Sequence, residues 1–161
     1  MNFLDWLGVT NTGKPLAVGE TAPDVVARDE QGNEVRLASF YDDGFTLVYF
    51  YPKADTPGCT AQACSLRDDF AQLQARGVRV IGVSADDSRS QLRFKEKHRL
   101  PFVLLADPER AVARAFGVPL MLGLTRRQSF LIKDGRVVWR DLSASTRAQA
   151  QDVLNVLEKV H

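Results

Sequence analysis

The sequence predicts an α/β protein with a central mixed sheet flanked by helices. Apolar runs of strand length, such as residues 45–51 and 78–84, alternate with segments of helical spacing. That alternation is typical of parallel strands joined by crossover helices. The dipeptide Asp134-Gly135 between two further apolar runs is a strong hairpin signal, so antiparallel strands are also expected. A chain of 161 residues can bury the core of one such domain.

The expected elements begin with two short strands and then alternate. They are strands within residues 21–37 around a turn at 31–33, a strand at 45–51, a helix at 62–76, a strand at 78–84, a helix at 88–99, a strand at 102–107, a helix at 108–116, strands at 128–133 and 136–141, and a final helix. The continuous apolar run Phe45–Tyr51 suits a strand that is buried on both faces.

Helix boundaries follow from spacing and from end signals. In the helix at 62–76, Leu66, Phe70 and Leu73 recur at i, i+4 and i+7, and Gly77 supplies the stop. Thr146 is expected to cap the last helix. The apolar stripe of that helix consists of Val153, Leu154, Leu157 and Val160.

Composition and charge exclude several function classes. The net charge of +1 gives no electrostatic reason to expect a nucleic acid or an anionic membrane as partner. The N-terminus carries Asp5 within a short apolar stretch and no basic region, so it is a poor secretory signal, and we expect a cytoplasmic protein. We divide the chain into an extension at 1–20 and a domain at 21–161.

Both cysteines of the chain lie in the stretch YPKADTPGCTAQAC, residues 51–64. Cys59 follows a buried strand and a loop, at or near the first turn of a helix. Reacting groups collect at the carboxyl ends of strands in open α/β sheets, and a helix start stabilises a thiolate. Thr56 can place a hydroxyl near the sulfur, while Pro57 and Gly58 favour a tight loop. The pattern indicates a reactive cysteine.

Cys64 lies five residues after Cys59. On one regular helix the two Cα atoms are about 8.6 Å apart, whereas a disulfide requires about 4.4–6.8 Å. The two cysteines therefore either never bond, or bond only when the first turns of the helix unwind.

These residues resemble a known family. The residues Pro52, Thr56 and Cys59 match the PxxxTxxC signature of the peroxiredoxins. The longer string YPKADTPGCTAQACSLRD resembles the bacterioferritin comigratory protein, or peroxiredoxin Q, subfamily. The resemblance runs from about Thr21 to the C-terminus, through the TAPD segment and the late RxxFLI-x-DG segment.

The resemblance implies a thioredoxin-like fold, with the first two strands as an N-terminal β-hairpin addition, and thiol-dependent reduction of hydroperoxides. Cys59 would be the peroxidatic nucleophile and Cys64 the resolving thiol, joined in an intramolecular disulfide. Thioredoxin or a similar dithiol would recycle it. We expect a monomer with no cofactor and no metal, haem or nucleotide.

The same resemblance assigns three further site residues. Thr56 would hydrogen-bond the sulfur and the peroxide, and Pro52 would shield the pocket from water. The arginine that the family carries on a later strand matches Arg127. Arg126 is the alternative, and strand alternation would point the two to opposite faces.

Simpler interpretations stand beside these. Cys59 could be an inert buried cysteine, Cys64 a plain helix residue and Thr56 only a turn or cap residue. Arg127 could be a solvent-facing strand residue. The basic run at residues 89–99 is interpreted as a solvated helix face, with docking of an acidic reductase surface as the alternative.

Two rival functions remain open. One is a thioredoxin-like protein thiol–disulfide oxidoreductase, although that chemistry normally uses a spacer of two residues between its cysteines. The other is a non-enzymatic redox-sensing or chaperone-like interaction protein that uses the extended N-terminus.

Two segments depart from the subfamily pattern. The first twenty residues have no counterpart, and their apolar side chains Phe3, Leu4, Trp6 and Leu7 could dock on the domain or on a partner. The segment at 118–125 lacks the longer basic and aromatic stretch expected before the arginine strand.

Overall fold

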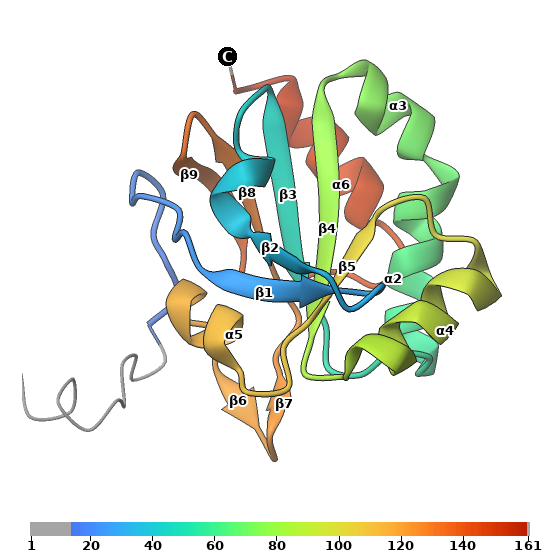
Figure 1. Cartoon of the computed structure of the whole chain (residues 1–161). Helices are drawn as coiled ribbons and strands as arrows, with labels where there is room; N and C mark the ends of the chain where they lie inside the picture. Colours follow the sequence, from blue (N-terminus) through green and yellow to red (C-terminus); the bar gives the residue numbers. More distant parts are fainter. Residues whose placement is uncertain (1–13, 161) are drawn as a thin grey trace, which may run out of the picture.

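Seven strands form the central sheet of the structure, a computed structural model that describes residues 14–160 (Figure 1). Their order across the sheet is β2-β1-β5-β4-β3-β8-β9. The strands are β1 (Val26–Asp29), β2 (Glu34–Arg36), β3 (Phe45–Phe50), β4 (Val78–Ser84), β5 (Val103–Ala106), β8 (Gln128–Lys133) and β9 (Arg136–Asp141).

The sheet is mixed, as the sequence predicts. The central strand β3 pairs in parallel with β4 and antiparallel with β8. The strands β1 and β2 form the predicted antiparallel pair at one edge, and β8 and β9 form the predicted hairpin around Asp134-Gly135 at the other. The carboxyl ends of β3 and β4 therefore lie at the same end of the sheet, where the reactive loop follows β3.

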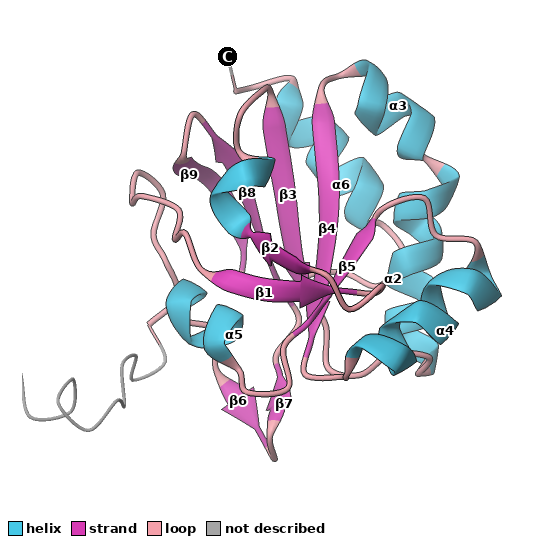
Figure 2. Ribbon diagram, in the orientation of Figure 1, coloured by secondary structure: helices cyan, strands magenta, loops and turns pink. Residues whose placement is uncertain are grey.

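Helices cover both faces of the sheet (Figure 2). They are the 3-10 turn η1 (Leu37–Phe40) and the helices α2 (Pro57–Asp68), α3 (Phe70–Ala75), α4 (Ser88–His98), α5 (Ala111–Phe116) and α6 (Gln149–Leu157). The helices α2, α3, α4 and α6 share one core with Leu47, Tyr49 and Tyr51 of the β3 segment. The turn η1 and helix α5 share the other core with Val48 and Phe50. Strand β3 is thus buried on both faces because alternate residues enter different cores.

Several predicted helix boundaries differ from the structure. The helix expected from residue 108 begins only at Ala111, after Arg110 in left-handed geometry. Helical geometry extends from the expected segment at 62–76 back to Pro57, whose fixed backbone suits the first helical position. Cys59 therefore lies in the first turn, as predicted. The helix α2 ends at Asp68, because Asp69 leaves helical geometry and separates α2 from α3, so the expected single helix is broken there. Thr146 does not cap α6, which begins at Gln149. The approach to α6 is instead held by Ser145, whose hydroxyl donates to the Asp152 carboxylate at 2.9 Å.

The segment expected to connect a helix to the arginine strand forms a small hairpin of β6 (Leu120–Met121) and β7 (Leu124–Thr125). Its turn residues Leu122 and Gly123 both have positive φ, 53° and 79°, the geometry of a type I′ turn. Such turns usually carry Asn-Gly, and leucine in the first position hides the signal. Leu122 is 98% exposed at the tip.

Residues 14–20 lie against the domain. The Leu16 N–H donates to the Phe116 carbonyl at 3.0 Å, and the Arg140 guanidinium donates to the carbonyls of Pro15 and Leu16. The apolar residues Phe3, Leu4, Trp6 and Leu7 lie outside the described residues. Between residues 14 and 160, no helix is long and apolar enough to cross a membrane.

Candidate active site

Cys59 lies in the first turn of α2, directly after the loop that leaves β3. Its side chain is 1% exposed and packs in the core shared with Tyr49, Tyr51 and Ala63. The Thr60 N–H donates to the Thr56 carbonyl at 2.8 Å, which closes the first helical turn. The preceding N–H groups have no partner within the helix, so the positive end of the helix faces this region.

Arg127 contacts the sulfur of Cys59. One terminal nitrogen, Nη2, lies 3.4 Å from Cys59 Sγ, and the other, Nη1, donates to Gln62 Oε1 at 2.7 Å. Gly58 makes room for the guanidinium, because a Cβ atom there would lie 3.0 Å from Nη2. Arg126 is exposed, and its backbone N–H donates to the Pro119 carbonyl. Of the two candidate arginines, the structure brings Arg127 to the cysteine.

Cys64 lies on the same helix as Cys59, and both thiols are free. Its side chain is half-buried. Because α2 runs without interruption from Pro57 to Asp68, the two Cα atoms keep the helical separation of about 8.6 Å. A bond between these sulfurs is incompatible with the helix as it stands.

Thr56 does not reach the sulfur in this structure. Its hydroxyl donates to the Lys53 carbonyl at 2.7 Å, and its side chain does not cap α2. Pro52 is half-buried at the start of the same loop. The loop is held at its first residue, where the Tyr51 carbonyl accepts from Thr125 Oγ1 at 2.7 Å.

Asp55 is a loop residue that sequence reasoning missed. Its φ of 61° is left-handed, a conformation that Asp tolerates better than most residues. Its carboxylate lies 2.8 Å from Lys97 Nζ and 3.1 Å from His98 Nε2. Lys97 and then His98 hold the pKa of Asp55 below its usual value. The end of the basic run is therefore more than a solvated face.

Gln62 and Tyr49 are also site residues that the sequence analysis did not single out. Gln62 lies three residues after Cys59, so both share one face of α2, which is the signal that could have found it. Tyr49 is fully buried beneath the helix, and burial holds the pKa of its hydroxyl well above its usual value. Within the described residues, no group bonds the Tyr49 hydroxyl.

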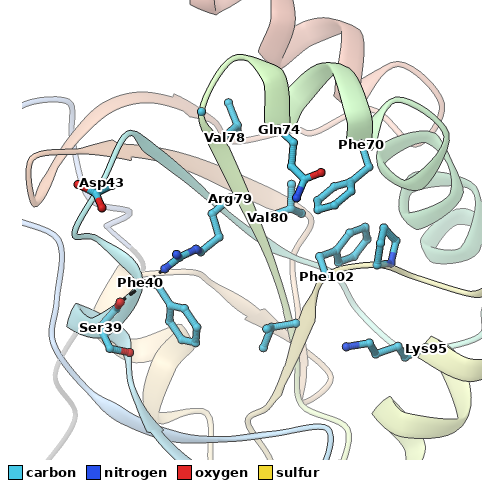
Figure 3. Close-up of a pocket in the computed structure, with 13 residues that line it drawn as sticks. Ser39, Phe40, Asp43, Phe70, Gln74, Val78, Arg79, Val80, Lys95 and Phe102 are labelled. Atoms are coloured by element: carbon cyan, nitrogen blue, oxygen red, sulfur yellow. Dashed lines mark hydrogen bonds between the residues drawn. The ribbon is translucent and has the colours of Figure 1, made fainter.

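A large surface pocket lies away from Cys59. It has a volume of about 570 Å³ and lies beside the start of β4, with Phe40, Phe70 and Phe102 among its lining residues (Figure 3). None of the candidate site residues lines it. Among residues 14–160, no three His, Cys, Asp or Glu side chains are grouped to hold a metal ion.

The fold and this site define a thioredoxin-like protein with a cysteine at the start of the helix after a central strand. The chain belongs to the AhpC/TSA family, whose model matches residues 18–140. Its relatives are peroxiredoxins of the Bcp and Q type, which confirms the resemblance found in the sequence.

Two relatives show the extent of the match. Peroxiredoxin Bcp of Escherichia coli is 42% identical over 155 residues, which cover 90% of this chain and 97% of that protein. Chloroplastic peroxiredoxin Q of Oryza sativa is also 42% identical, over 76% of this chain, but the chain spans only 57% of its length.

Solved structures agree with the sequence relatives. Peroxidoxin BcpB of Mycobacterium tuberculosis superposes with a TM-score of 0.84 at 34% identity, covering 91% of this chain and 99% of that one. The bacterioferritin comigratory protein of Xanthomonas campestris, described for its alkyl peroxide reduction activity, has a TM-score of 0.80 at 26% identity over 89% and 98% of the two chains. These relatives and neighbours are named as peroxiredoxins, a peroxidoxin or a bacterioferritin comigratory protein, and none of them as a thiol–disulfide oxidoreductase.

Proposed function

We propose that the protein is a thiol-dependent peroxidase that reduces hydrogen peroxide and organic hydroperoxides. One observation carries the proposal: the guanidinium of Arg127 lies 3.4 Å from a buried cysteine sulfur at the start of a helix. Both features stabilise negative charge on that sulfur. The names of the relatives and the alkyl peroxide activity described for the Xanthomonas protein support this substrate class.

The first step is attack of the Cys59 thiolate on the terminal peroxide oxygen. The O–O bond breaks, Cys59 becomes a sulfenic acid, and the leaving alkoxide takes up a proton to form an alcohol, or water from hydrogen peroxide. Arg127 stabilises the charge that moves from sulfur to the leaving oxygen. In this proposal Thr56 turns its hydroxyl from the Lys53 carbonyl toward the peroxide, and Pro52 limits access of water.

The second step joins the two cysteines. The Cys64 thiolate attacks the Cys59 sulfenic sulfur, a disulfide forms, and hydroxide leaves as water after protonation. Since the helical separation forbids this bond, the first turns of α2 must unwind. An external dithiol, thioredoxin or a similar protein, then reduces the disulfide by exchange.

An intramolecular disulfide needs no second subunit, so we propose a monomer. We also propose a cytoplasmic location, because reduction of the disulfide by a dithiol protein depends on a reducing compartment.

Single-turnover peroxide reduction with mass analysis tests the assignment. Cys59→Ser should abolish peroxide consumption, because the remaining thiol, Cys64, has no contact with the Arg127 guanidinium and does not lie in the first turn of α2. Cys64→Ser should still consume one equivalent of peroxide and retain a sulfenic acid, but should fail to turn over with a dithiol protein as reductant. Full turnover by Cys59→Ser would show that the nucleophile is misassigned.

A further inference from the structure

A buried chain of side-chain hydrogen bonds connects the arginine at the active site to the C-terminal helix. Arg127 Nη1 donates to Gln62 Oε1 at 2.7 Å, and Gln62 Nε2 donates to Gln149 Oε1 at 3.3 Å. The Ser129 hydroxyl donates to the same Gln149 oxygen. The other three residues of this hydrogen-bonded series are fully buried: Gln62, Ser129 and Gln149 are each 0% exposed.

We propose that Gln149 is a positioning residue for Arg127 and acts through Gln62. The inference rests on the proposed function only in taking Cys59 as the reactive thiol. Gln149 is the first residue of α6 and is far from Cys59 in the sequence, so its role comes from the fold and not from the motif.

The donor and acceptor atoms of these hydrogen bonds fix the orientation of the Gln62 amide. A guanidinium can only donate, so Gln62 must present its oxygen to Arg127. The Gln62 amide nitrogen then points the other way and needs an acceptor. Gln149 supplies that acceptor, and its oxygen is held in place by a second donor, the hydroxyl of Ser129. A donor in place of the Gln149 oxygen would oppose the orientation that Arg127 requires of Gln62.

The other end of the Gln149 amide indicates which atom the site uses. Within residues 14–160, no group accepts from Gln149 Nε2, although that atom is buried. The amide is therefore oriented by its oxygen, which satisfies two donors. The polar contacts of this side chain with the described residues are therefore the two hydrogen bonds that its oxygen accepts.

Arg127 is held by a neutral amide and not by a carboxylate. Among the described residues, no Asp or Glu forms an ion pair with Arg127. An amide partner fixes the guanidinium without cancelling its charge, so the full positive charge acts on Cys59 Sγ. Gln149 thereby favours the Cys59 thiolate without touching it.

The test is a thiolate titration in a Cys64→Ser background, where Cys59 is the only thiol. Gln149→Leu keeps the side-chain size and removes the acceptor. We expect the midpoint of the thiolate absorbance titration to move to higher pH, and peroxide reduction at neutral pH to slow about tenfold. In an Arg127→Ala background, Gln149→Leu should have no further effect on either measurement, because its effect passes through the arginine.

Val153→Ala is the matched control, because it perturbs a fully buried residue of the same helix outside the chain of hydrogen bonds. It should lower Tm and leave the titration midpoint unchanged. The proposal is overturned if Gln149→Leu leaves the midpoint in place, if it shifts the midpoint equally without Arg127, or if Val153→Ala gives the same shift. A wild-type protein that consumes no peroxide, but whose midpoint still responds to Gln149→Leu, would refute the proposed function and retain this inference.

Discussion

Arg127 is the residue whose position most directly shapes the chemistry of the site. Arg126 and Arg127 are adjacent, yet only Arg127 reaches the sulfur, from its place directly before β8. A cation at 3.4 Å in a partly water-excluded site stabilises a thiolate more strongly than the same charge in solvent.

Replacing each of the two arginines distinguishes the effect of the contact with Cys59 from the effect of a nearby positive charge on the reaction rate. Arg127→Ala should slow formation of the Cys59 sulfenic acid about a hundredfold, the scale seen when one preorganised donor is removed. Arg126→Ala removes the same charge from an exposed position and should change the rate less than about twofold. Stopped-flow measurement of the first peroxide turnover checks both. Equal effects of the two substitutions would contradict the assigned contact.

Some residues of the site can be predicted from the sequence, and others cannot. Cys59, Cys64 and the Pro52–Thr56 loop stand in one contiguous motif, so their places after β3 and along α2 follow from it. The direction of the Thr56 hydroxyl does not, since it donates to the Lys53 carbonyl. Gln62 was detectable from its helical spacing to Cys59. Gln149 could not be detected in this way, because only the packing of α6 against α2 brings it to Gln62. No local sequence pattern indicates that contact.

At the scale of the element, residues on both sides of the two cysteines of α2 contact the end of α4. Asp55, just before α2, pairs with Lys97 and His98 at the end of α4. Arg67, near the end of α2, donates to the His98 carbonyl at 2.7 Å. Unwinding that begins at Pro57 can therefore be confined to the segment between Asp55 and Arg67, which contains both cysteines.

The elements that the sequence predicted well are those with long apolar runs or strong turn residues. Strands β3, β4 and β8 were placed within a residue or two because each is buried and continuous. The hairpin of β6 and β7 was missed because its strands have two residues each and its turn carries leucine. The break at Asp69 was missed because the apolar stripe continues across it.

At the scale of the whole molecule, burial of the tyrosines links stability to alkaline pH. The chain has three tyrosines, Tyr41, Tyr49 and Tyr51, and desolvation is the first cause that raises the pKa of each hydroxyl. A raised pKa in the folded state means that folding disfavours tyrosinate. The neutral, buried tyrosines contribute fully to the free energy of unfolding below the unfolded pKa of about 10. That contribution is lost as the pH rises above this value.

We expect tyrosinate absorbance and loss of circular dichroism to appear together in an alkaline titration. In denaturant, the same tyrosines should ionise near pH 10, about the value of a free side chain. Ionisation of the tyrosines near that pH in a protein that keeps its folded spectrum would contradict the burial described for them.

A disulfide between Cys59 and Cys64 requires α2 to unwind, and the proposed cycle depends on this change. Hydrogen exchange read by mass spectrometry, on reduced and peroxide-treated wild-type protein, tests it directly. We predict a mass lower by two hydrogen atoms, a bridged peptide containing both cysteines, and faster exchange over residues 57–66, while β3 stays protected. A disulfide between these cysteines with α2 as protected as in the reduced protein, or peroxide turnover without that disulfide, would contradict the account.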